Sequence, residues 1–297
     1  MRWIGFAVIL AIVVLGGLAV RDSRGRAMSP VGEDRTTTSR DGTTIAYTKR
    51  GSGPPLIIVD GVFCYRENGP ATELASLLAQ HYTVFTYDRR GRGESGDTPP
   101  YAVEREIDDL RALAKAAGAT PFVLGISSGA ALTLQAVASG VGARKLALYE
   151  PPYAADANRP RPLDDATHRL QSFISAGDRA GAVRFFMTDV FGAPRAFVFA
   201  MPFLMPTAWK RNKLVVHTAP YDLTILGDMS VLSERSSSIS VPTLVVGGER
   251  SPQGLRDAVT AVANALPNGE SRFLSGQDHN ISGPVLVPIL VEYFGRA

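Results

Sequence analysis

The sequence predicts an α/β fold in which a mostly parallel, twisted sheet is covered by helices on both faces. Short apolar runs typical of buried strands alternate with helical segments over residues 56–149 and again over 242–294. This alternation is typical of parallel sheets, because each connecting helix packs on a face of the sheet. Two β-prone runs also flank Asp41-Gly42, a favoured hairpin turn. We therefore expect an antiparallel hairpin at one edge of the sheet.

The individual elements follow from the local pattern along the chain. Strands are expected where apolar and β-branched residues form short continuous runs, and helices where longer amphipathic or Ala/Leu-rich runs follow them. The strands after the hairpin are expected at 56–59, 83–87, 122–126, 145–149, 242–246 and 271–274. The helices are expected at about 71–80, 103–117, from the Ser127 turn to 139, 255–265 and 284–294.

The alternation stops between residues 151 and 240. This segment is rich in Phe, Met, Trp and Pro and shows no strand pattern, so we predict a helical cap inserted at 151–240. Residues 35–150 and 241–297 then form the α/β core. The aromatic and Met side chains of the insertion either pack its own interior or close over the site as an adaptable apolar lid.

The chain begins with an apolar segment. No charged residue lies between Ile4 and Val20, and at about 1.5 Å per residue this segment is at the short end of what spans a bilayer. We predict an uncleaved membrane anchor at 1–20 and a linker at 21–34, with a cleaved signal peptide as the alternative. Arg21, Arg24 and Arg26 outnumber Arg2, which favours a cytoplasmic catalytic domain.

Composition limits the classes of function. The chain has 297 residues, 45% of them hydrophobic, and a formal net charge of +3, which indicates a globular protein and gives no reason to expect nucleic-acid binding. The densest basic run, Arg89-Arg90-Gly91-Arg92, predicts a solvated turn rather than a phosphate-binding patch. Cys64 is the only cysteine, so no intrachain disulfide and no cysteine-based metal site can form.

The most informative motif is Gly125-Ile126-Ser127-Ser128-Gly129, between an apolar strand and an Ala/Leu-rich helix. A sharp strand-to-helix turn presents the central serine at the carboxyl end of the strand, and the glycines leave room for the turn. An ordinary turn is the plainer explanation of the five residues alone. Their position in the predicted sheet favours Ser127 as a nucleophile.

A serine hydroxyl needs a base within hydrogen-bond reach, and histidine is suited to this at neutral pH. His279 alone follows a strand in the resumed α/β alternation, so its loop should lie at the same end of the sheet as Ser127. The other three histidines precede a strand or lie in the insertion; these are His81, His168 and His217.

Two further motifs each directly follow a predicted strand of the sheet. Asp60-Gly61-Val62 follows the strand at 56–59, and Asp88-Arg89-Arg90-Gly91-Arg92-Gly93-Glu94-Ser95 follows the strand at 83–87. With the Ser127 turn and the late His279, this order resembles the α/β-hydrolase superfamily over about residues 35–294, apart from the insertion. The resemblance implies that Ser127 is the nucleophile, that His279 is the base, and that the amides of Val62 and Ser128 form an oxyanion hole. Asp60 stands where the family usually has histidine.

The third residue of the expected catalytic triad, the acid, differs from the family pattern. The family usually places an aspartate in the loop after the strand that follows the insertion, and this chain has Ser251 there. We predict that Glu150, at the end of the strand at 145–149, supplies the acid, as in haloalkane-dehalogenase-like relatives. A dyad without a carboxylate also stays open, as do four other acids: Asp222, Asp228, Glu249 and Asp278.

These residues predict a serine hydrolase that cleaves an ester-like bond of a small or lipid-like apolar substrate, without a metal or an organic cofactor. Because Ser127 is not a carboxylate, dehalogenase and epoxide-hydrolase chemistry is disfavoured. The alternatives are a cofactor-free haloperoxidase using the same site and a non-catalytic binding protein of the same fold. The expected partners are a small-molecule substrate and, through residues 4–20, a membrane. The oligomeric state stays open.

Overall fold

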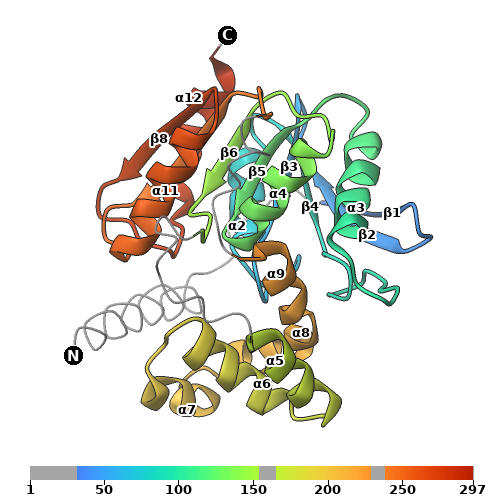
Figure 1. Ribbon diagram of the computed structural model, residues 1–297. Coiled ribbons are helices and arrows are strands. Elements are labelled where there is room, and N and C mark those ends of the chain that lie inside the picture. Colours follow the sequence, from blue (N-terminus) through green and yellow to red (C-terminus); the bar gives the residue numbers. More distant parts are fainter. Residues whose placement is uncertain (1–31, 154–164, 229–237, 297) are drawn as a thin grey trace.

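The computed structural model describes residues 32–153, 165–228 and 238–296, and these residues form an eight-stranded sheet (Figure 1). The strand order is β1-β2-β4-β3-β5-β6-β7-β8. The strands are β1 (Glu33–Thr38), β2 (Thr44–Arg50), β3 (Pro55–Val59), β4 (Thr83–Tyr87), β5 (Phe122–Ile126), β6 (Leu146–Tyr149), β7 (Thr243–Gly248) and β8 (Gly269–Leu274). β2 pairs antiparallel with β1 and β4, and the remaining pairs are parallel. The predicted parallel sheet with an antiparallel hairpin at its edge is confirmed.

Helices cover both faces of this sheet. They are α2 (Ala71–Leu78), α3 (Val103–Ala116), α4 (Ser128–Ala138), α11 (Gln253–Ala265) and α12 (Gly283–Gly295). Successive strand residues point to opposite faces. Ile57 therefore belongs to the apolar cluster that also contains residues of α3, α4 and α11, whereas Leu56 and Ile58 belong to the cluster of α2 and α12. Burial on both sides explains why inner strands such as β5 and β6 are continuous apolar runs, whereas the edge strand β8 is mostly exposed.

The segment between β6 and β7 contains no strand in the part that the structure describes. Its elements are α5 (Ala166–Ser175), α6 (Arg179–Phe185), the π-helix η1 (Phe186–Val190), α7 (Arg195–Leu204), α8 (Pro206–Val215), the 3-10 turn η2 (Val216–Thr218) and α9 (Ala219–Leu226). We call residues 165–228 the cap. Figure 1 shows α5–α8 grouped beyond one end of the sheet, with α9 between them and the core. Most of the cap's Phe, Met and Trp side chains are buried in its own apolar cluster.

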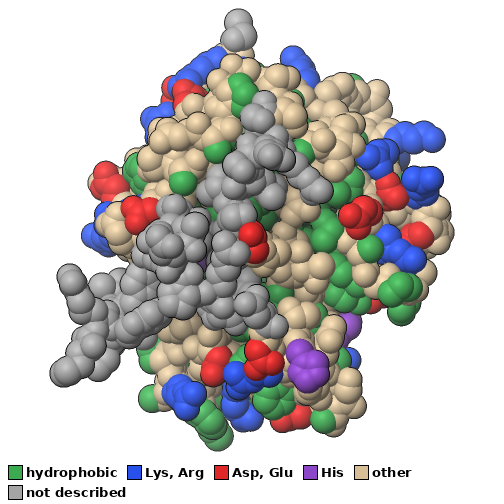
Figure 2. Space-filling model, in the orientation of Figure 1, with side chains coloured by type: hydrophobic (Ala, Val, Ile, Leu, Met, Phe, Trp, Pro, Cys, Tyr) green, Lys and Arg blue, Asp and Glu red, His purple; other side chains and the backbone are tan. Residues whose placement is uncertain are grey.

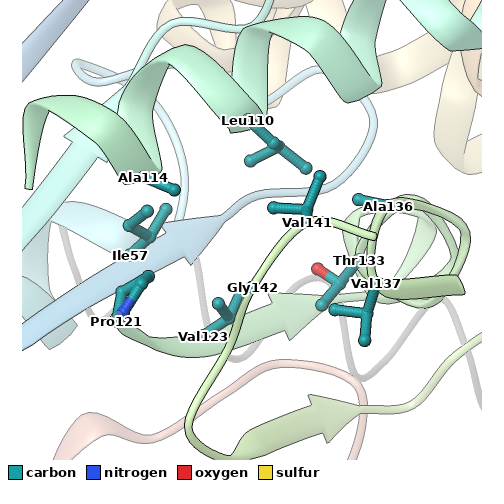
Figure 3. A pocket seen from close by; sticks show the side chains of 10 residues that line it. All are labelled: Ile57, Leu110, Ala114, Pro121, Val123, Thr133, Ala136, Val137, Val141 and Gly142. Carbon is teal, nitrogen blue, oxygen red and sulfur yellow. The ribbon is translucent and has the colours of Figure 1, made fainter. Parts of the chain in front are cut away.

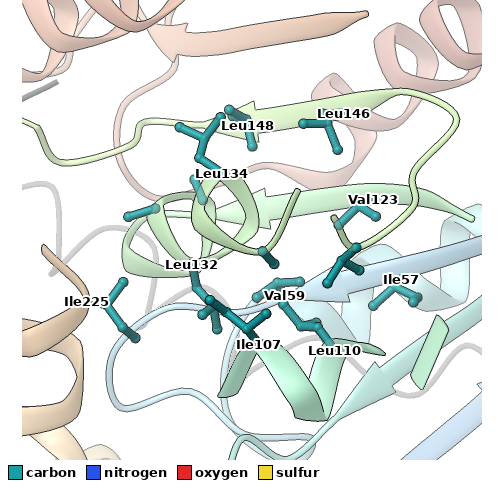
Figure 4. Packing of buried hydrophobic residues seen from close by; sticks show 14 of the residues in the cluster. Ile57, Val59, Ile107, Leu110, Val123, Leu132, Leu134, Leu146, Leu148 and Ile225 are labelled. Carbon is teal, nitrogen blue, oxygen red and sulfur yellow. The ribbon is translucent and has the colours of Figure 1, made fainter. Parts of the chain in front are cut away.

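Apolar side chains join the cap to the core. Phe63 and Tyr65, from the segment after β3, are members of the cap's apolar cluster. Ile225 of α9 belongs to the core cluster and lies beside Leu132 of α4 (Figure 4). The cap is therefore packed against the carboxyl ends of the strands.

The predicted solvated turn at Arg89-Arg90-Gly91-Arg92 is wrong. The three arginines are 1%, 0% and 1% exposed. Buried arginine is tolerated only where carboxylates pair with it. Arg89 pairs with Glu106 and Asp222, Arg90 with Asp109, and Arg92 with Asp222. On the face of the molecule in Figure 2, by contrast, basic and acidic side chains are interspersed over the surface.

The predicted anchor at 1–20 lies outside the described residues, as does the linker up to residue 31. Its role in the membrane stays a prediction. Among the helices that the structure describes, none combines the length and the apolar character needed to cross a bilayer.

Candidate active site

Ser127 lies in a sharp turn between β5 and α4. Its backbone has φ 54° and ψ −125°, which costs energy for a residue with a Cβ. A Cβ on Gly125 would lie 2.6 Å from Ala130 Cα, and one on Gly129 would lie 2.3 Å from the carbonyl oxygen of Val59. These contacts explain why both flanking positions are glycine. The geometry is that of a nucleophile elbow.

Backbone strain is concentrated around this turn. In the described chain, the non-glycine residues with positive φ are Phe63, Ser127 and Glu150, at 61°, 54° and 45°. They follow β3, β5 and β6, three neighbouring parallel strands that end at the same edge of the sheet. Strain of this kind persists where the surrounding structure imposes it, and it is frequent at functional sites.

His279 and Glu150 meet at this edge. His279 Nδ1 lies 2.7 Å from Glu150 Oε2, and the Glu150 side chain is fully buried. The other carboxylate oxygen, Oε1, accepts hydrogen bonds from the Gly248 amide at 2.8 Å and from the Ser251 hydroxyl. Serine thus stands at the family's usual aspartate position and contacts the carboxylate that comes from β6.

These contacts keep Glu150 ionised. Burial alone would raise the pKa of Glu150, but the hydrogen bond and charge of His279, with the Gly248 and Ser251 donors, lower it below its ordinary value. An ionised carboxylate can only accept, so His279 Nδ1 carries the proton of their hydrogen bond. His279 Nε2 is then the ring nitrogen left to accept a proton.

In the described residues, no hydrogen bond joins the hydroxyl of Ser127 to His279. Such catalytic contacts are often long in free enzymes and shorten when the substrate binds. The candidate nucleophile, base and acid still lie in the segments that follow β5, β8 and β6, whose carboxyl ends share one edge of the sheet.

The other candidate acids have different surroundings. Of the five carboxylates that we considered, only Glu150 hydrogen-bonds His279 in the part of the chain that the structure describes. Asp222 is buried and binds arginines, Glu249 is exposed, and Asp278 accepts from the amide of Asn280 at 2.7 Å. Asp228 lies two residues beyond the end of α9.

The candidate oxyanion amides belong to Ser128, which follows Ser127, and to Val62, which follows a glycine close to Ser127. Ser128 begins α4, and the Ser127 side chain does not cap that helix, so the amide of Ser128 at the first helical position has no acceptor within the helix. Gly61 lies close by, since a Cβ there would be 3.1 Å from Ser127 Cβ. The amide of Val62 follows directly.

Asp60 is turned away from this site. Its carboxylate accepts from the Gly61 amide at 3.1 Å and from the Ala71 amide, at the start of α2, at 3.3 Å. Burial raises the pKa of Asp60 to about 6. The departure from histidine at this position is therefore accommodated by two backbone donors.

The sequence reasoning missed a buried polar network beside the elbow. The Ser128 hydroxyl donates to Asp222 at 2.7 Å, and Asp222 also binds Arg89 and Arg92. The sequence held one sign of this network. Three arginines lie between an apolar strand and a helix that carries Glu106 and Asp109, which could have indicated buried ion pairs, but nothing in the local pattern identifies Asp222 as a partner.

The cap reaches the site through Phe191. This residue directly follows the π-helix η1, and its ring centroid lies 6.1 Å from that of His279. Phe186 of η1 makes an edge-to-face contact with the strained Phe63, with centroids 5.0 Å apart. Short π-helical turns often occur at functional sites.

The small apolar cavity in Figure 3 is a separate feature, lined by side chains such as Leu110, Pro121 and Val141. Pro121 precedes β5, so this cavity lies at the opposite end of that strand from Ser127. Among the described residues, no group of three or more His, Cys, Asp or Glu side chains is arranged to hold a metal ion.

Comparison with known proteins agrees with this geometry. The profile described as the alpha/beta hydrolase family matches residues 60–287. An alpha/beta hydrolase from Sphaerobacter thermophilus is 45% identical, with a TM-score of 0.80, over 88% of this chain and 100% of that chain. The protein belongs to the α/β-hydrolase family.

Other similar proteins are more distant or match in part. An uncharacterized hydrolase of Bacillus subtilis, YraK, is 41% identical over 100 residues, which are 31% of this chain and 35% of that protein. The match thus spans about a third of that relative's length. The esterase RhEst1 from Rhodococcus shares the fold, with a TM-score of 0.61 and 19% identity over 90% of this chain and 98% of that one.

Proposed function

We propose that this hydrolase cleaves carboxylic esters through an acyl-enzyme intermediate on Ser127. The observation that carries the proposal is the 2.7 Å contact between His279 Nδ1 and the buried Glu150, at the strand edge where the Ser127 elbow ends. An ionised acid that holds a neutral imidazole in one orientation is what a serine nucleophile requires. A binding protein of this fold would have no need for the pair, so the contact favours an enzyme.

The reaction then has two halves. Ser127 Oγ attacks the ester carbonyl while His279 Nε2 takes the hydroxyl proton, and Glu150 stabilises the imidazolium. The carbonyl oxygen becomes an oxyanion that accepts from the amides of Val62 and Ser128. His279 returns the proton to the leaving alcohol, the C–O bond breaks, and an acyl-Ser127 ester remains. Water, deprotonated by His279, then releases the acid and restores the Ser127 hydroxyl.

The proposed substrate is a small or lipid-like apolar ester. Phe191 beside His279 supplies an aromatic surface next to the reacting atoms, and aromatic walls with few polar groups suit apolar ligands. In this proposal the cap forms the lid of the site. The shared fold with the esterase RhEst1 is compatible with ester hydrolysis, although at 19% identity it is evidence for the fold alone.

A fluorophosphonate probe tests the nucleophile and base together, because it reacts only with an activated serine. We expect labelling of the wild-type protein and loss of labelling in Ser127→Ala and His279→Ala. His168→Ala is a matched control, since His168 is exposed on α5 of the cap. If the folded wild-type protein is neither labelled nor able to hydrolyse short-chain p-nitrophenyl esters, the proposal is wrong.

A further inference from the structure

We propose that Asp222, on the cap helix α9, is a positioning residue that holds both amides of the oxyanion hole in place. The proposal rests on the proposed function, because it assigns a role to the amides of Val62 and Ser128. It goes beyond that function by making a cap residue part of the support of the core's active site.

The first connection runs through the residue after the nucleophile. The Ser128 hydroxyl donates to Asp222 Oδ1 at 2.7 Å, and both residues are buried. Hydrogen bonds to a charged acceptor are stronger than neutral ones. Because Ser128 carries the oxyanion amide on the same residue, fixing its side chain restricts the orientation of that amide.

The second connection runs through Arg92 to the loop after β3. One terminal nitrogen of the Arg92 guanidinium, Nη2, binds Asp222 Oδ2. The second terminal nitrogen, Nη1, donates to the carbonyl oxygens of Gly61 at 2.7 Å and Cys64 at 3.2 Å. These carbonyls flank Val62 in sequence, so Arg92 holds the segment that presents the second amide.

The cap holds the same arginine by a further contact. Arg92 Nε donates to Thr218 Oγ1, in η2 directly before α9, at 2.9 Å. The Gln135 side chain of α4 also donates to the carbonyl oxygen of Ile225 at 2.5 Å, which fixes α9 on the elbow helix. Arg92 is thus bound by groups on both sides of the boundary between cap and core, and α9 is fixed where Asp222 reaches this arginine.

Asp222 acts in its ionised form. Burial raises the pKa of Asp222, but the charges of Arg89 and Arg92 and the Ser128 hydrogen bond lower it below its ordinary value. Arg89 Nη1 donates to Asp222 Oδ1 at 2.6 Å, and Glu106 binds the other side of the same guanidinium at 2.8 Å. Two buried cations therefore face two buried anions, and the group is electrically balanced.

Glu106 provides a matched comparison for Asp222. Both are buried carboxylates that bind Arg89. In the described residues, only Asp222 of the two also contacts Ser128 and Arg92. A loss that reflects stability alone should appear in variants of either residue, whereas a positioning role should appear only for Asp222.

The test compares Ser128→Ala, Asp222→Asn and Glu106→Gln in ester hydrolysis. Ser128→Ala removes the hydroxyl and keeps the amide, and we expect kcat to fall about tenfold with little change in KM, the equivalent of one hydrogen bond lost in the transition state. Asp222→Asn should lower kcat about a hundredfold, which is the scale for a misplaced oxyanion donor. Glu106→Gln should lower the melting temperature and keep kcat.

A trifluoromethyl ketone supplies an independent readout, because it forms a tetrahedral oxyanion adduct on the active serine. Its affinity should weaken in Ser128→Ala by the same factor as kcat, while fluorophosphonate still labels Ser127. Wild-type kcat and ketone affinity in Ser128→Ala would overturn the positioning role and leave the proposed function standing. If Asp222→Asn does not fold, Ser128→Ala alone decides. Failure of the proposed function would appear differently, as absence of labelling in the wild-type protein.

Discussion

The hydroxyl of Ser251 donates a hydrogen bond to Oε1 of Glu150, while Oε2 of the same carboxylate binds His279. The end of β7 therefore supports an acid that the end of β6 provides. Serine at position 251 is therefore compatible with a negative charge beside His279. Its hydroxyl does not supply that charge but donates to the Glu150 carboxylate, which does. The proposed acid thus comes from another strand end than in the usual family pattern, and the residue at the usual acid position supports it.

Replacement of Glu150 by glutamine should be severe. The amide carries no charge to stabilise the His279 imidazolium, and we expect kcat to fall by about 10³-fold or more, as for loss of the orienting acid in other triads. Glu249→Gln is the matched control, since Glu249 is exposed in the loop after β7, and its kcat should stay near wild type. Steady-state hydrolysis of p-nitrophenyl butyrate measures both. Near-full turnover in Glu150→Gln would show that Glu150 is not the acid.

An aspartate at position 251 should partly rescue that loss. Ser251 contacts the Glu150 side chain next to His279, so Ser251→Asp in the Glu150→Gln background returns a carboxylate to the site. We expect kcat to recover about tenfold, the scale of one charge-assisted hydrogen bond. Ser251→Asn in the same background is the uncharged control and should give no recovery. Equal rates for the two double variants would contradict this geometry.

Asp60→Asn should raise stability increasingly as pH rises. Burial raises the folded pKa of Asp60 from 3.8 to about 6, so the folded state binds this proton more tightly than the unfolded state. The stability contribution of Asp60 is complete below pH ~4 and is lost as pH rises towards ~6. The gain of Asp60→Asn over wild type should therefore grow across this window, by at most about 3 kcal/mol. Urea unfolding at pH 3.5, 4.5, 6 and 8 measures it.

Glu150→Gln provides the opposite sign in the same experiment. The folded pKa of Glu150 is lowered from 4.5, so its contribution is present above that value and is lost as pH falls through the folded pKa. The loss of unfolding free energy in Glu150→Gln relative to wild type should shrink below about pH 4.5.

For the Asp60 prediction, a gain in unfolding free energy in Asp60→Asn that does not change with pH would argue against a buried, ionised Asp60 at neutral pH.

Phe191→Ala should change substrate preference. Its ring lies beside His279, with centroids 6.1 Å apart, and removal of the ring opens space at the reacting atoms. We expect kcat/KM for bulky esters to rise about tenfold relative to the acetate, within the range for altered apolar contacts. Phe199→Ala is the control, because Phe199 is 59% exposed on α7. A series of p-nitrophenyl esters measures the ratio, and parallel changes for all chain lengths would contradict the assignment.

The sequence predicted what depends on local pattern. The parallel sheet followed from alternating apolar runs, and the sharp Ser127 turn followed from its flanking glycines. The contact of Glu150 with His279 could be expected because both residues lie in segments that follow strands of one parallel sheet. The burial of Arg89 and Arg92 could not be foreseen, since the partner that they share, Asp222, lies about 130 positions away in sequence. Hydrophobic periodicity contains no information on such pairs, so a basic turn was expected to face solvent.

The docking of α9 has a thermal consequence. Ile225 of this helix is buried in the core cluster, and Asp222 three residues earlier neutralises arginines that the core has already buried. If α9 detached, Arg92 would lose the carboxylate that pairs with it and Arg89 would keep only Glu106. Removing one partner of a buried ion pair costs several kcal/mol. The cap therefore cannot unfold before the core as a separate unit. On heating, both parts should lose their structure in one cooperative step.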